Sequence, residues 1–423
     1  MNKKLPPAPW TRRADLAELI AALGAGNARY VGGAVRDTLL GLEVKDIDLA
    51  TPLVPGEVMA RLDKAKVRTV PTGIEHGTLT ALLKHGPVEI TTLRHDVSTD
   101  GRRATVAFAE DWREDAARRD FTINALYSDP ATGEIFDYFG GLEDLAARRV
   151  RFIGDARQRI REDHLRILRY FRFQARFGSE PADEASEQAC AELAAMLKGL
   201  SRERIGMEML NLLALPDPAP VTVRMAELGV LAVILPEALV QPLTALIANE
   251  KQQNVAPDPL RRLAALVPAD VAVAEHIAAR FRLSGAQKKR MAIAAGRGEK
   301  PHPFRRGVGL EPVGQPGVSP GGQASPPTPS PEEAGALYAR TLAYRLGLDS
   351  ALDRLLLTGE STAPLAGWTI PIFLLKGGEI VARGVNAGPK VARILRAVED
   401  RWVAEGFPAR ARVDEILDEE LGR

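Results

Sequence analysis

Apolar residues recur along the chain in two different patterns. Between Thr11 and Leu23 they recur at helical spacing, which predicts a short amphipathic helix. From Arg29 to about Phe152, stretches of alternating apolar and polar residues are mixed with loops and helical segments. From Asp155 onward the sequence is rich in Ala, Leu and Arg and keeps helical periodicity between proline breaks. The pattern predicts a small head of strands and helices, followed by helices only.

One segment interrupts the helical region. Residues 296–331 hold nine of the thirty prolines together with Gly, Ser and Gln, and this composition buries too little apolar surface to fold. Helical sequence resumes at Glu332, and an apolar stripe follows at Val391, Ile394, Leu395, Val398 and Trp402. The expected domains are a head (1–153), a helical neck and body (154–295), a flexible linker (296–331) and a helical tail (332–423).

Two aspartates separated by one residue carry the first candidate chemistry. Alternate residues of a strand face the same way, so on a strand Asp46 and Asp48 would point together while Ile47 and Leu49 point into the core. Carboxylates held side by side repel each other unless a cation lies between them, and their hard oxygen atoms suit Mg²⁺. A pair of Mg²⁺ ions can stabilise both oxygens of a phosphoryl transfer, which makes the two aspartates candidate catalytic residues.

A glycine pair lies upstream of these aspartates. Gly32 and Gly33 lack side chains, so their backbone amides can approach a polyphosphate closely. An Arg-Asp pair follows, in which Arg36 supplies positive charge and Asp37 stands beside it. Taken alone, a D-x-D pair is usually part of a solvated loop or strand edge, and a Gly-Gly pair is usually a turn. Together, the glycines, the Arg-Asp pair and the aspartates predict a site for a nucleoside triphosphate.

A second polar cluster, RRDFTINA, begins at Arg118. Arg118 and Arg119 offer guanidinium groups for phosphate, while Asp120 and Asn124 can hydrogen-bond to a ribose or to the arginines. An Arg-Arg pair taken alone is more often a solvated helix face, so both interpretations stay open for this cluster.

A third cluster lies on a predicted helix at 162–177, EDHLRILRYFRFQARF. At 100° per residue, Arg166, Arg169 and Arg172 lie opposite the apolar side chains, with Asp163 at the border. Composition alone favours an amphipathic helix whose basic face is solvated.

Taken together and in this order, residues 32–50, 118–125 and 162–177 resemble the first, second and fourth motifs of the class II nucleotidyltransferases, which comprise CCA-adding enzymes and bacterial poly(A) polymerases. Two further stretches, DYFGGLEDL at 137–145 and SRERIGME at 201–208, resemble the third and fifth motifs of that family. The resemblance implies an α+β fold: a nucleotidyltransferase head with a small mixed sheet, then an all-helical neck, body and tail. It also implies addition of CCA to the 3′ end of tRNA from CTP and ATP, with release of pyrophosphate.

The resemblance assigns roles to residues. Asp46 and Asp48 would hold Mg²⁺, and the E-D-x-x-R group would read the incoming base through Asp163 and Arg166. Arg169 and Arg172 would bind the triphosphate or support these readers. The intact E-D-x-x-R group favours CCA addition, complete or partial, over poly(A) synthesis, and the intact aspartates disfavour a non-catalytic RNA-binding relative.

Two features between the first and second motifs extend the expected site. Glu89 lies on a predicted strand; it is a candidate third carboxylate, although strand edges also carry Glu for solubility. The polar stretch 94–103 matches a flexible loop that, in the family, helps to switch preference from C to A. Its candidate residues are Arg94, Asp96, Arg102 and Arg103.

Composition limits the partners and the compartment. The net charge is +1, so tRNA must be bound by local basic faces rather than by an overall field. The chain has one cysteine, Cys190, which excludes an intrachain disulfide and fits a reducing compartment. The N-terminal sequence MNKKLPPAPW has no apolar run typical of a signal peptide, and no stretch is long enough to span a membrane. We therefore expect a cytoplasmic protein.

Overall fold

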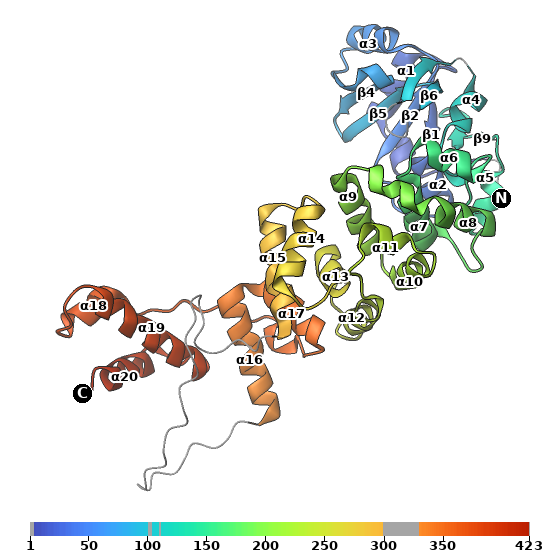
Figure 1. Ribbon diagram of the computed structural model, residues 1–423. Coiled ribbons are helices and arrows are strands. Elements are labelled where there is room, and N and C mark those ends of the chain that lie inside the picture. Colours follow the sequence, from blue (N-terminus) through green and yellow to red (C-terminus); the bar gives the residue numbers. More distant parts are fainter. Residues whose placement is uncertain (1–3, 100–103, 110, 299–329, 423) are drawn as a thin grey trace. The chain divides into compact units, whose positions relative to one another are not determined.

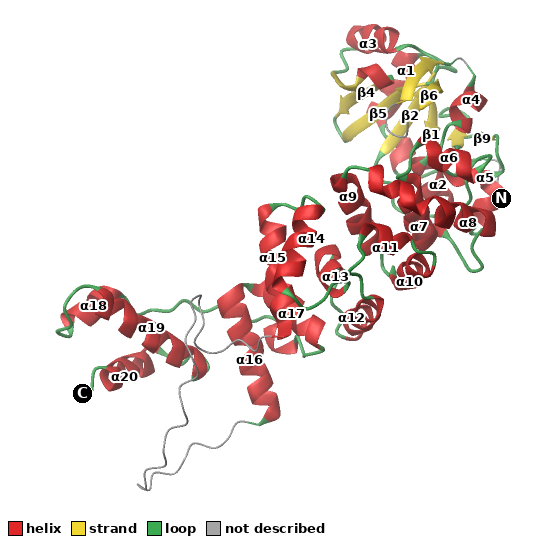
Figure 2. Ribbon diagram, viewed as in Figure 1, coloured by secondary structure: helices red, strands yellow, loops and turns green. Residues whose placement is uncertain are grey.

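The computed structural model describes residues 4–99, 104–109, 111–298 and 330–422. The chain divides into two compact units, Met1–Pro236 and Glu237–Arg423 (Figure 1). The predicted fold class is confirmed, because the first unit joins a mixed sheet to helices and every strand within the described ranges lies in that unit (Figure 2). None of the helices in these ranges combines the length and hydropathy needed to cross a membrane.

A seven-stranded sheet forms the head. Its strand order is β3 (Thr69–Gly73), β4 (Thr78–Leu83), β5 (Gly86–Thr92), β2 (Ile47–Thr51), β1 (Arg29–Val31), β8 (Leu126–Ser128) and β9 (Ile135–Asp137). Only β2 and β5 pair in parallel; the other pairs are antiparallel. A separate hairpin consists of β6 (Arg94–Thr99) and β7 (Ala104–Phe108). The head helices are α1 (Ala14–Leu23), α2 (Gly33–Leu39), α3 (Pro55–Lys64), α4 (Trp112–Ala117) and α5 (Gly141–Ala146).

The alternation predicted for the aspartate strand is present. Ile47 and Leu49 are buried, whereas Asp48 is half-buried and Asp46, just before the strand, is exposed. Further along the strand the alternation ends, because Ala50, on the same face as Asp48, is buried as well. The two carboxylates therefore lie at the start of β2, where this face of the strand is less covered.

Helices that follow the head complete the first unit. They are α6 (Ala156–Glu162), α7 (Arg166–Phe177), α8 (Glu184–Leu193), α9 (Arg202–Leu213), α10 (Ala219–Glu227) and α11 (Val230–Ile234). Aromatic packing fixes α7 to the head: Phe121 lies 5.0 Å from Phe152 and 5.1 Å from Phe173 between ring centroids, and Tyr170 stacks on Phe152. Aromatic side chains thus pack together across residue 153, where the sequence predicted the boundary between head and neck.

The single helix predicted for 162–177 is wrong, because the chain breaks between α6 and α7. Asp163 has an extended backbone (φ −148°, ψ 106°), and its carboxylate accepts a hydrogen bond from the backbone amide of Leu165 (3.1 Å). A short acidic side chain that bonds to its own neighbouring backbone competes with helical hydrogen bonds. The break turns Asp163 out of the helix that carries the arginines.

The second unit is helical. Its helices are α12 (Val240–Gln252), α13 (Pro259–Ala265), α14 (Val271–Arg280), α15 (Gly285–Ala295), α16 (Pro331–Leu346), α17 (Leu348–Thr358), α18 (Gly377–Ala382), α19 (Pro389–Ala404) and α20 (Arg410–Glu420). Most of the predicted linker, 299–329, lies outside the described residues. The predicted apolar stripe is confirmed in α19, where Ile394, Val398 and Trp402 are buried in one core.

Buried ion pairs join the predicted body to the predicted tail. Arg261 on α13 contacts Glu250 on α12 (2.7 Å) and Asp353 on α17 (3.0 Å), and Arg290 on α15 contacts Asp353 (2.6 Å). Glu250, Arg261 and Asp353 are each at most 5% exposed. The expected boundary at 331 therefore does not separate two independently packed parts, since α17 belongs to the core of the body helices.

Candidate active site

Two carboxylates face each other on adjacent strands, and a third lies just before one of these strands. In the parallel pair of β2 with β5, Asp48 is directly opposite Glu89, and Asp46 stands two residues before Asp48. Burial, together with the negative charges of Glu89 and Asp46, raises the pKa of Asp48 to about 6. Protein groups therefore leave the negative charge at this place incompletely balanced.

The donor set fits a hard divalent cation held mainly by carboxylate oxygen atoms. No group of three or more Asp, Glu, His or Cys side chains among the described residues is gathered closely enough to complete a metal site alone. Mg²⁺ commonly keeps waters and substrate phosphate oxygens among its ligands, so two carboxylates facing a triphosphate suit it. The structure thus brings the predicted third carboxylate to the predicted pair.

The glycine turn faces the second motif. Gly32 adopts φ +67°, a conformation that strains residues with a side chain. A Cβ placed on Gly32 would lie 3.5 Å from the carbonyl oxygen of Asn124 and 3.6 Å from Nη1 of Arg119. Arg119 also acts electrostatically on Asp48, lowering its pKa against the larger effect of burial. The glycine turn, Arg119 and the carboxylates therefore surround one place.

A buried aspartate that the sequence analysis missed holds both arginines of the second motif. Asp115 on α4 accepts hydrogen bonds from Nε of Arg118 (2.8 Å) and from Nη2 of Arg119 (3.1 Å). The hydroxyl of Tyr127 donates to the same carboxylate (2.6 Å) and accepts from Nε of Arg119 (3.1 Å). Burial raises the pKa of Asp115, but Arg119 and Arg118 hold it at about 2. The signal was present in the sequence, as an acidic residue three and four positions before two arginines.

The other residues of the second motif bind protein groups. Asp120 accepts hydrogen bonds from Nε (2.8 Å) and Nη2 (2.6 Å) of Arg169 and from the side-chain amide of Asn124 (2.9 Å). Burial would raise the pKa of Asp120, but Arg169 and Asn124 hold it at about 2. Of the predicted alternatives for Asp120 and Asn124, the structure shows bonds to arginines.

Arg36 is buried, at 5% exposed. It donates to Asp37 (2.7 Å) and to the side-chain oxygen of Asn124, and its guanidinium lies 4.1 Å from the ring centroid of Phe177. Asp37 also pairs with Arg176 (3.3 Å). Arg36 thus ties the helix after the glycine turn to α7, and direct contact with phosphate stays a prediction for this residue.

The two candidate base readers are held by different partners. Asp163 accepts hydrogen bonds from Nη2 of Arg204 (2.9 and 3.2 Å), a residue of the fifth motif for which the sequence predicts no role at the base. Arg166 donates to Glu162 (2.7 Å) and to the backbone carbonyl of Arg118 (2.9 Å). The backbone amide of Arg166 donates to the carbonyl oxygen of Asp163 (3.0 Å), but within the described part of the chain no side-chain hydrogen bond joins the two residues.

The basic face of α7 is paired rather than freely solvated. Side-chain exposure is 12% for Arg166, 32% for Arg169 and 18% for Arg172. Glu208 on α9 is buried and accepts from Nε of Arg172 (2.7 Å), with Nη1 of Arg169 at 4.0 Å. The face therefore forms part of an internal network between α7 and α9, which explains why composition alone misjudged it.

The third motif packs directly on the second. Asp137 accepts hydrogen bonds from the backbone amides of Phe139, Gly141 and Leu142 (3.2, 2.9 and 2.9 Å), which fixes the turn. A Cβ placed on Gly141 would lie 2.3 Å from the carbonyl oxygen of Thr122. Only a glycine permits this approach.

The predicted loop is described in part. The backbone of Asp96 lies in β6, but its side chain, like Arg102 and Arg103 entirely, lies outside the described residues. The backbone amide of Arg94 donates to Asp115 (3.4 Å), so the first residue of the hairpin contacts the carboxylate that holds the arginine pair.

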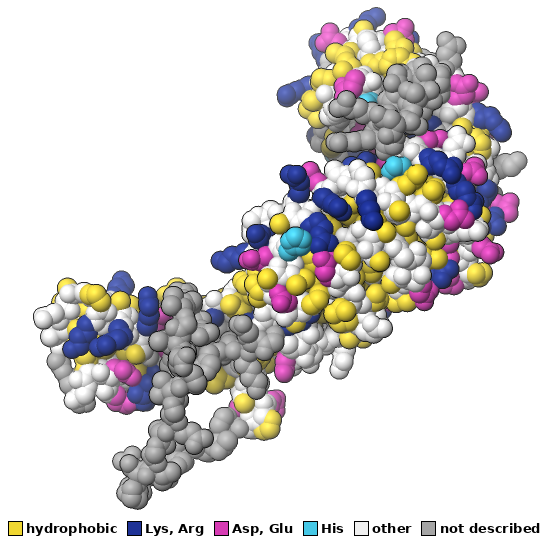
Figure 3. All heavy atoms as spheres, in the orientation of Figure 1, with side chains coloured by type: hydrophobic (Ala, Val, Ile, Leu, Met, Phe, Trp, Pro, Cys, Tyr) yellow, Lys and Arg dark blue, Asp and Glu magenta, His cyan; other side chains and the backbone are white. Residues whose placement is uncertain are grey.

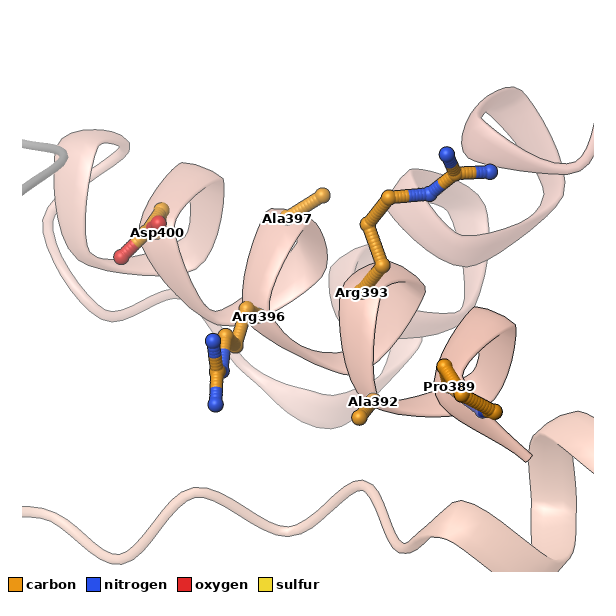
Figure 4. Close-up of a pocket in the computed structure, with 6 residues that line it drawn as sticks. All are labelled: Pro389, Ala392, Arg393, Arg396, Ala397 and Asp400. Atoms are coloured by element: carbon orange, nitrogen blue, oxygen red, sulfur yellow. The ribbon is translucent and has the colours of Figure 1, made fainter. Parts of the chain in front are cut away.

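A pocket of about 450 Å³ lies on α19 in the second unit, and its lining residues are Pro389, Ala392, Arg393, Arg396, Ala397 and Asp400 (Figure 4). Arg393 and Arg396 are exposed and extend from the helix in different directions. Elsewhere on the visible face basic and acidic side chains are interspersed, in keeping with the net charge of +1 (Figure 3).

Comparison with known proteins agrees with this geometry. Residues 28–151 match the family described as "Poly A polymerase head domain", and residues 182–240 match "Probable RNA and SrmB- binding site of polymerase A". CCA tRNA nucleotidyltransferase 1, mitochondrial, of Mus musculus is 33% identical over 406 residues, which cover 92% of this chain and 85% of that protein. The Homo sapiens protein of the same name is 50% identical over 188 residues, 44% of this chain and 43% of that protein.

A solved structure extends the likeness over the whole chain. The Bacillus stearothermophilus CCA-adding enzyme in complex with CTP superposes with a TM-score of 0.69 at 25% identity, covering 99% of each chain. Sequence and fold thus agree over nearly the full length, and the chain belongs to the CCA tRNA nucleotidyltransferase family.

Proposed function

We propose that this protein adds CCA, or part of it, to the 3′ end of tRNA, using CTP and ATP and releasing pyrophosphate. The observation that carries the proposal is the juxtaposition of Asp48 and Glu89 on adjacent parallel strands, beside the glycine turn and Arg119. Membership of the family and the CTP complex of a structural relative support it. A single buried cysteine supports a reducing, cytoplasmic location as part of this proposal.

The residues present fit a divalent metal cofactor. Asp46 and Asp48 would hold Mg²⁺, with Glu89 as the third carboxylate, because their mutual repulsion is not fully balanced by the protein. Bound there, Mg²⁺ would lower the pKa of the tRNA 3′-hydroxyl and stabilise the charge that develops during transfer.

The chain's own cations would bind the triphosphate. Arg118 bonds to Asp115 through Nε and Nη2, Arg119 bonds to it through Nη2, and Nη1 of Arg119 lies beside Gly32. A planar guanidinium offers two further donors to phosphate oxygens, in an orientation fixed before substrate arrives. Such preorganised donors stabilise the leaving pyrophosphate without reorganisation during the reaction.

The base would be selected by Asp163 and Arg166. An acceptor and a donor can satisfy the Watson-Crick edge of cytosine or of adenine if the pair rearranges between the two. Asp163 forms an ion pair with Arg204, and Arg166 forms one with Glu162. Each of these partners can fix the side chain of one base reader in a single orientation. Because Arg169 and Arg172 bond to Asp120 and Glu208, we assign them to supporting the readers.

The decisive experiment uses tRNA transcripts that lack the last three, two or one nucleotides, each incubated with one labelled nucleotide and resolved on a gel. We expect CTP to extend the first transcript by two residues and the second by one, and ATP to extend only the third. The Asp48→Asn variant serves as the control for contaminating activity. Long adenosine tails on every transcript would instead indicate a poly(A) polymerase, and extension of none would refute the proposal.

A further inference from the structure

Asp115 is the only residue of the described chain whose carboxylate bonds to both Arg118 and Arg119. It is 1% exposed and lies on α4, outside every motif that the sequence analysis assigned to chemistry. Its Oδ1 accepts from Nε (2.8 Å) and Nη2 (2.7 Å) of Arg118, and its Oδ2 accepts from Nη2 of Arg119 (3.1 Å). One buried carboxylate thus fixes two guanidinium groups that are adjacent in sequence.

The contacts leave a defined part of each arginine for a ligand. Nε of Arg119 is taken by the hydroxyl of Tyr127, and both Nη2 atoms are taken by Asp115. Among the described residues, no hydrogen bond or ion pair is made by Nη1 of either arginine, and that of Arg119 faces the Gly32 turn. Both Nη1 groups therefore belong to guanidinium planes whose orientation the bonds to Asp115 and Tyr127 already fix.

Charge and burial agree with this arrangement. Two guanidinium groups around one carboxylate leave an excess of one positive charge, which an anion can balance. Tyr127 is fully buried and packs edge-on against Trp112, so the hydroxyl that bridges Asp115 and Arg119 is held firmly. Ordering two long side chains before binding lowers the conformational cost that a ligand would otherwise meet.

We propose that Asp115 is a positioning residue for the triphosphate: it orients Arg118 and Arg119 so that their Nη1 groups meet the phosphates of either nucleotide. This inference rests on the proposed function, in which those arginines bind the triphosphate. Asp115 itself touches neither substrate nor metal; it acts through the two arginines.

The test uses a variant for which the charge effect and the orientation effect change anion affinity in opposite directions. Asp115→Asn removes a negative charge close to the phosphates, so electrostatics alone would make anions bind more tightly. Loss of orientation would make them bind more weakly. The probe is inorganic tripolyphosphate, which has no base or ribose, and its Kd is measured by calorimetry on the full chain. We expect Asp115→Asn to raise this Kd, and the KM of both CTP and ATP, by about tenfold, with the CTP-to-ATP ratio unchanged.

Two further variants keep the result interpretable. Asp111→Asn alters the residue that caps the same helix, where its carboxylate accepts from the amide of Arg113 (2.9 Å), and it should leave the Kd unchanged. Tyr127→Phe keeps the ring and removes only the bridging hydroxyl, so it should raise the Kd by a smaller factor and serves if Asp115→Asn does not fold.

The outcomes separate the two proposals. Wild-type or tighter tripolyphosphate binding in Asp115→Asn, or in Tyr127→Phe if the former is unfolded, would overturn the positioning role. A lowered unfolding midpoint with an unchanged Kd would show a purely structural role and overturn it equally. Failure of the wild-type protein to extend any tRNA transcript would refute the proposed function, and that assay does not depend on the tripolyphosphate measurement.

Discussion

Replacing Gly141 with alanine should damage both the stability of the first unit and the site, although Gly141 contacts no substrate. Gly141 is the first residue of α5, and the new Cβ would lie 2.3 Å from the carbonyl oxygen and 2.9 Å from the carbonyl carbon of Thr122. Thr122 lies between Asp120 and Asn124, the residues that bond to arginines of α7 and α2. The clash therefore pushes on the backbone of the second motif.

The loss of stability depends on which atoms the new Cβ would contact. An ordinary contact needs about 1 Å more separation, and the neighbour is backbone rather than the end of a flexible side chain. Overpacking typically costs about 1–3 kcal/mol, and a backbone clash belongs at the upper end. For a unit of this size, ~3 kcal/mol lowers the unfolding midpoint by about 6–12 °C.

The assay is thermal unfolding followed by circular dichroism, with KM for CTP measured at a temperature where the variant is folded. Gly56→Ala is the matched control, since that glycine is exposed in helix α3 of the same unit and has nothing within 4 Å of the new Cβ. Alanine there should be neutral or stabilise by up to about 1 kcal/mol. Equal midpoints for the two variants would refute the close approach of α5 to Thr122.

The other predictions concern the carboxylates, the base readers and the second unit. Asp48→Asn should lower the rate of nucleotide addition by roughly 10³ or more. The same variant should be more stable than the wild type at pH 7 in the absence of metal. The pKa of Asp48 is about 6 in the folded protein and 3.8 in the reference state, so its ionisation costs the wild type stability as pH rises from 4 to 6. A difference in unfolding midpoint between variant and wild type that is the same at pH 4 and pH 7 would contradict this. Asp163→Ala and Arg204→Ala should change the ratios of kcat/KM among CTP, ATP, UTP and GTP in the same direction, because the two side chains form one pair (2.9 Å); unchanged ratios would move base selection elsewhere. Asp353→Ala leaves buried Arg261 and half-buried Arg290 short of a partner and should destabilise the second unit by ~3–5 kcal/mol, seen as faster hydrogen exchange in 237–423 but not in 1–236.

Local regularities were readable from the sequence because they depend on neighbouring residues. Strand geometry alternates with a period of two, so the placement of Ile47 and Leu49 in the core and of Asp48 on the other face followed without any knowledge of the fold. The stripe containing Ile394, Val398 and Trp402 followed likewise from the helical period. The order of the motifs then identified the family, and with it the fold class.

Helix continuity could be predicted only approximately. The periodic pattern from 162 to 177 is helical throughout, yet Asp163 leaves the helix because its carboxylate bonds to the amide of Leu165 and to Arg204 on another helix. The first of these bonds is local and the second is not. Propensity and period describe single helices, so they cannot include a partner that another segment supplies.

Tertiary structure alone decided which charges meet. Glu89 became the neighbour of Asp48 through the parallel register of β2 and β5, and a shift of one residue would have turned it to the other face. Asp115 and Glu208 had no predicted partner until folding buried them against arginines of the second and fourth motifs. A buried charge must be paired, but the sequence does not say with which of many opposite charges. The sequence therefore determined the kinds of groups at this site, and the packing of the strands and helices around it determined their partners.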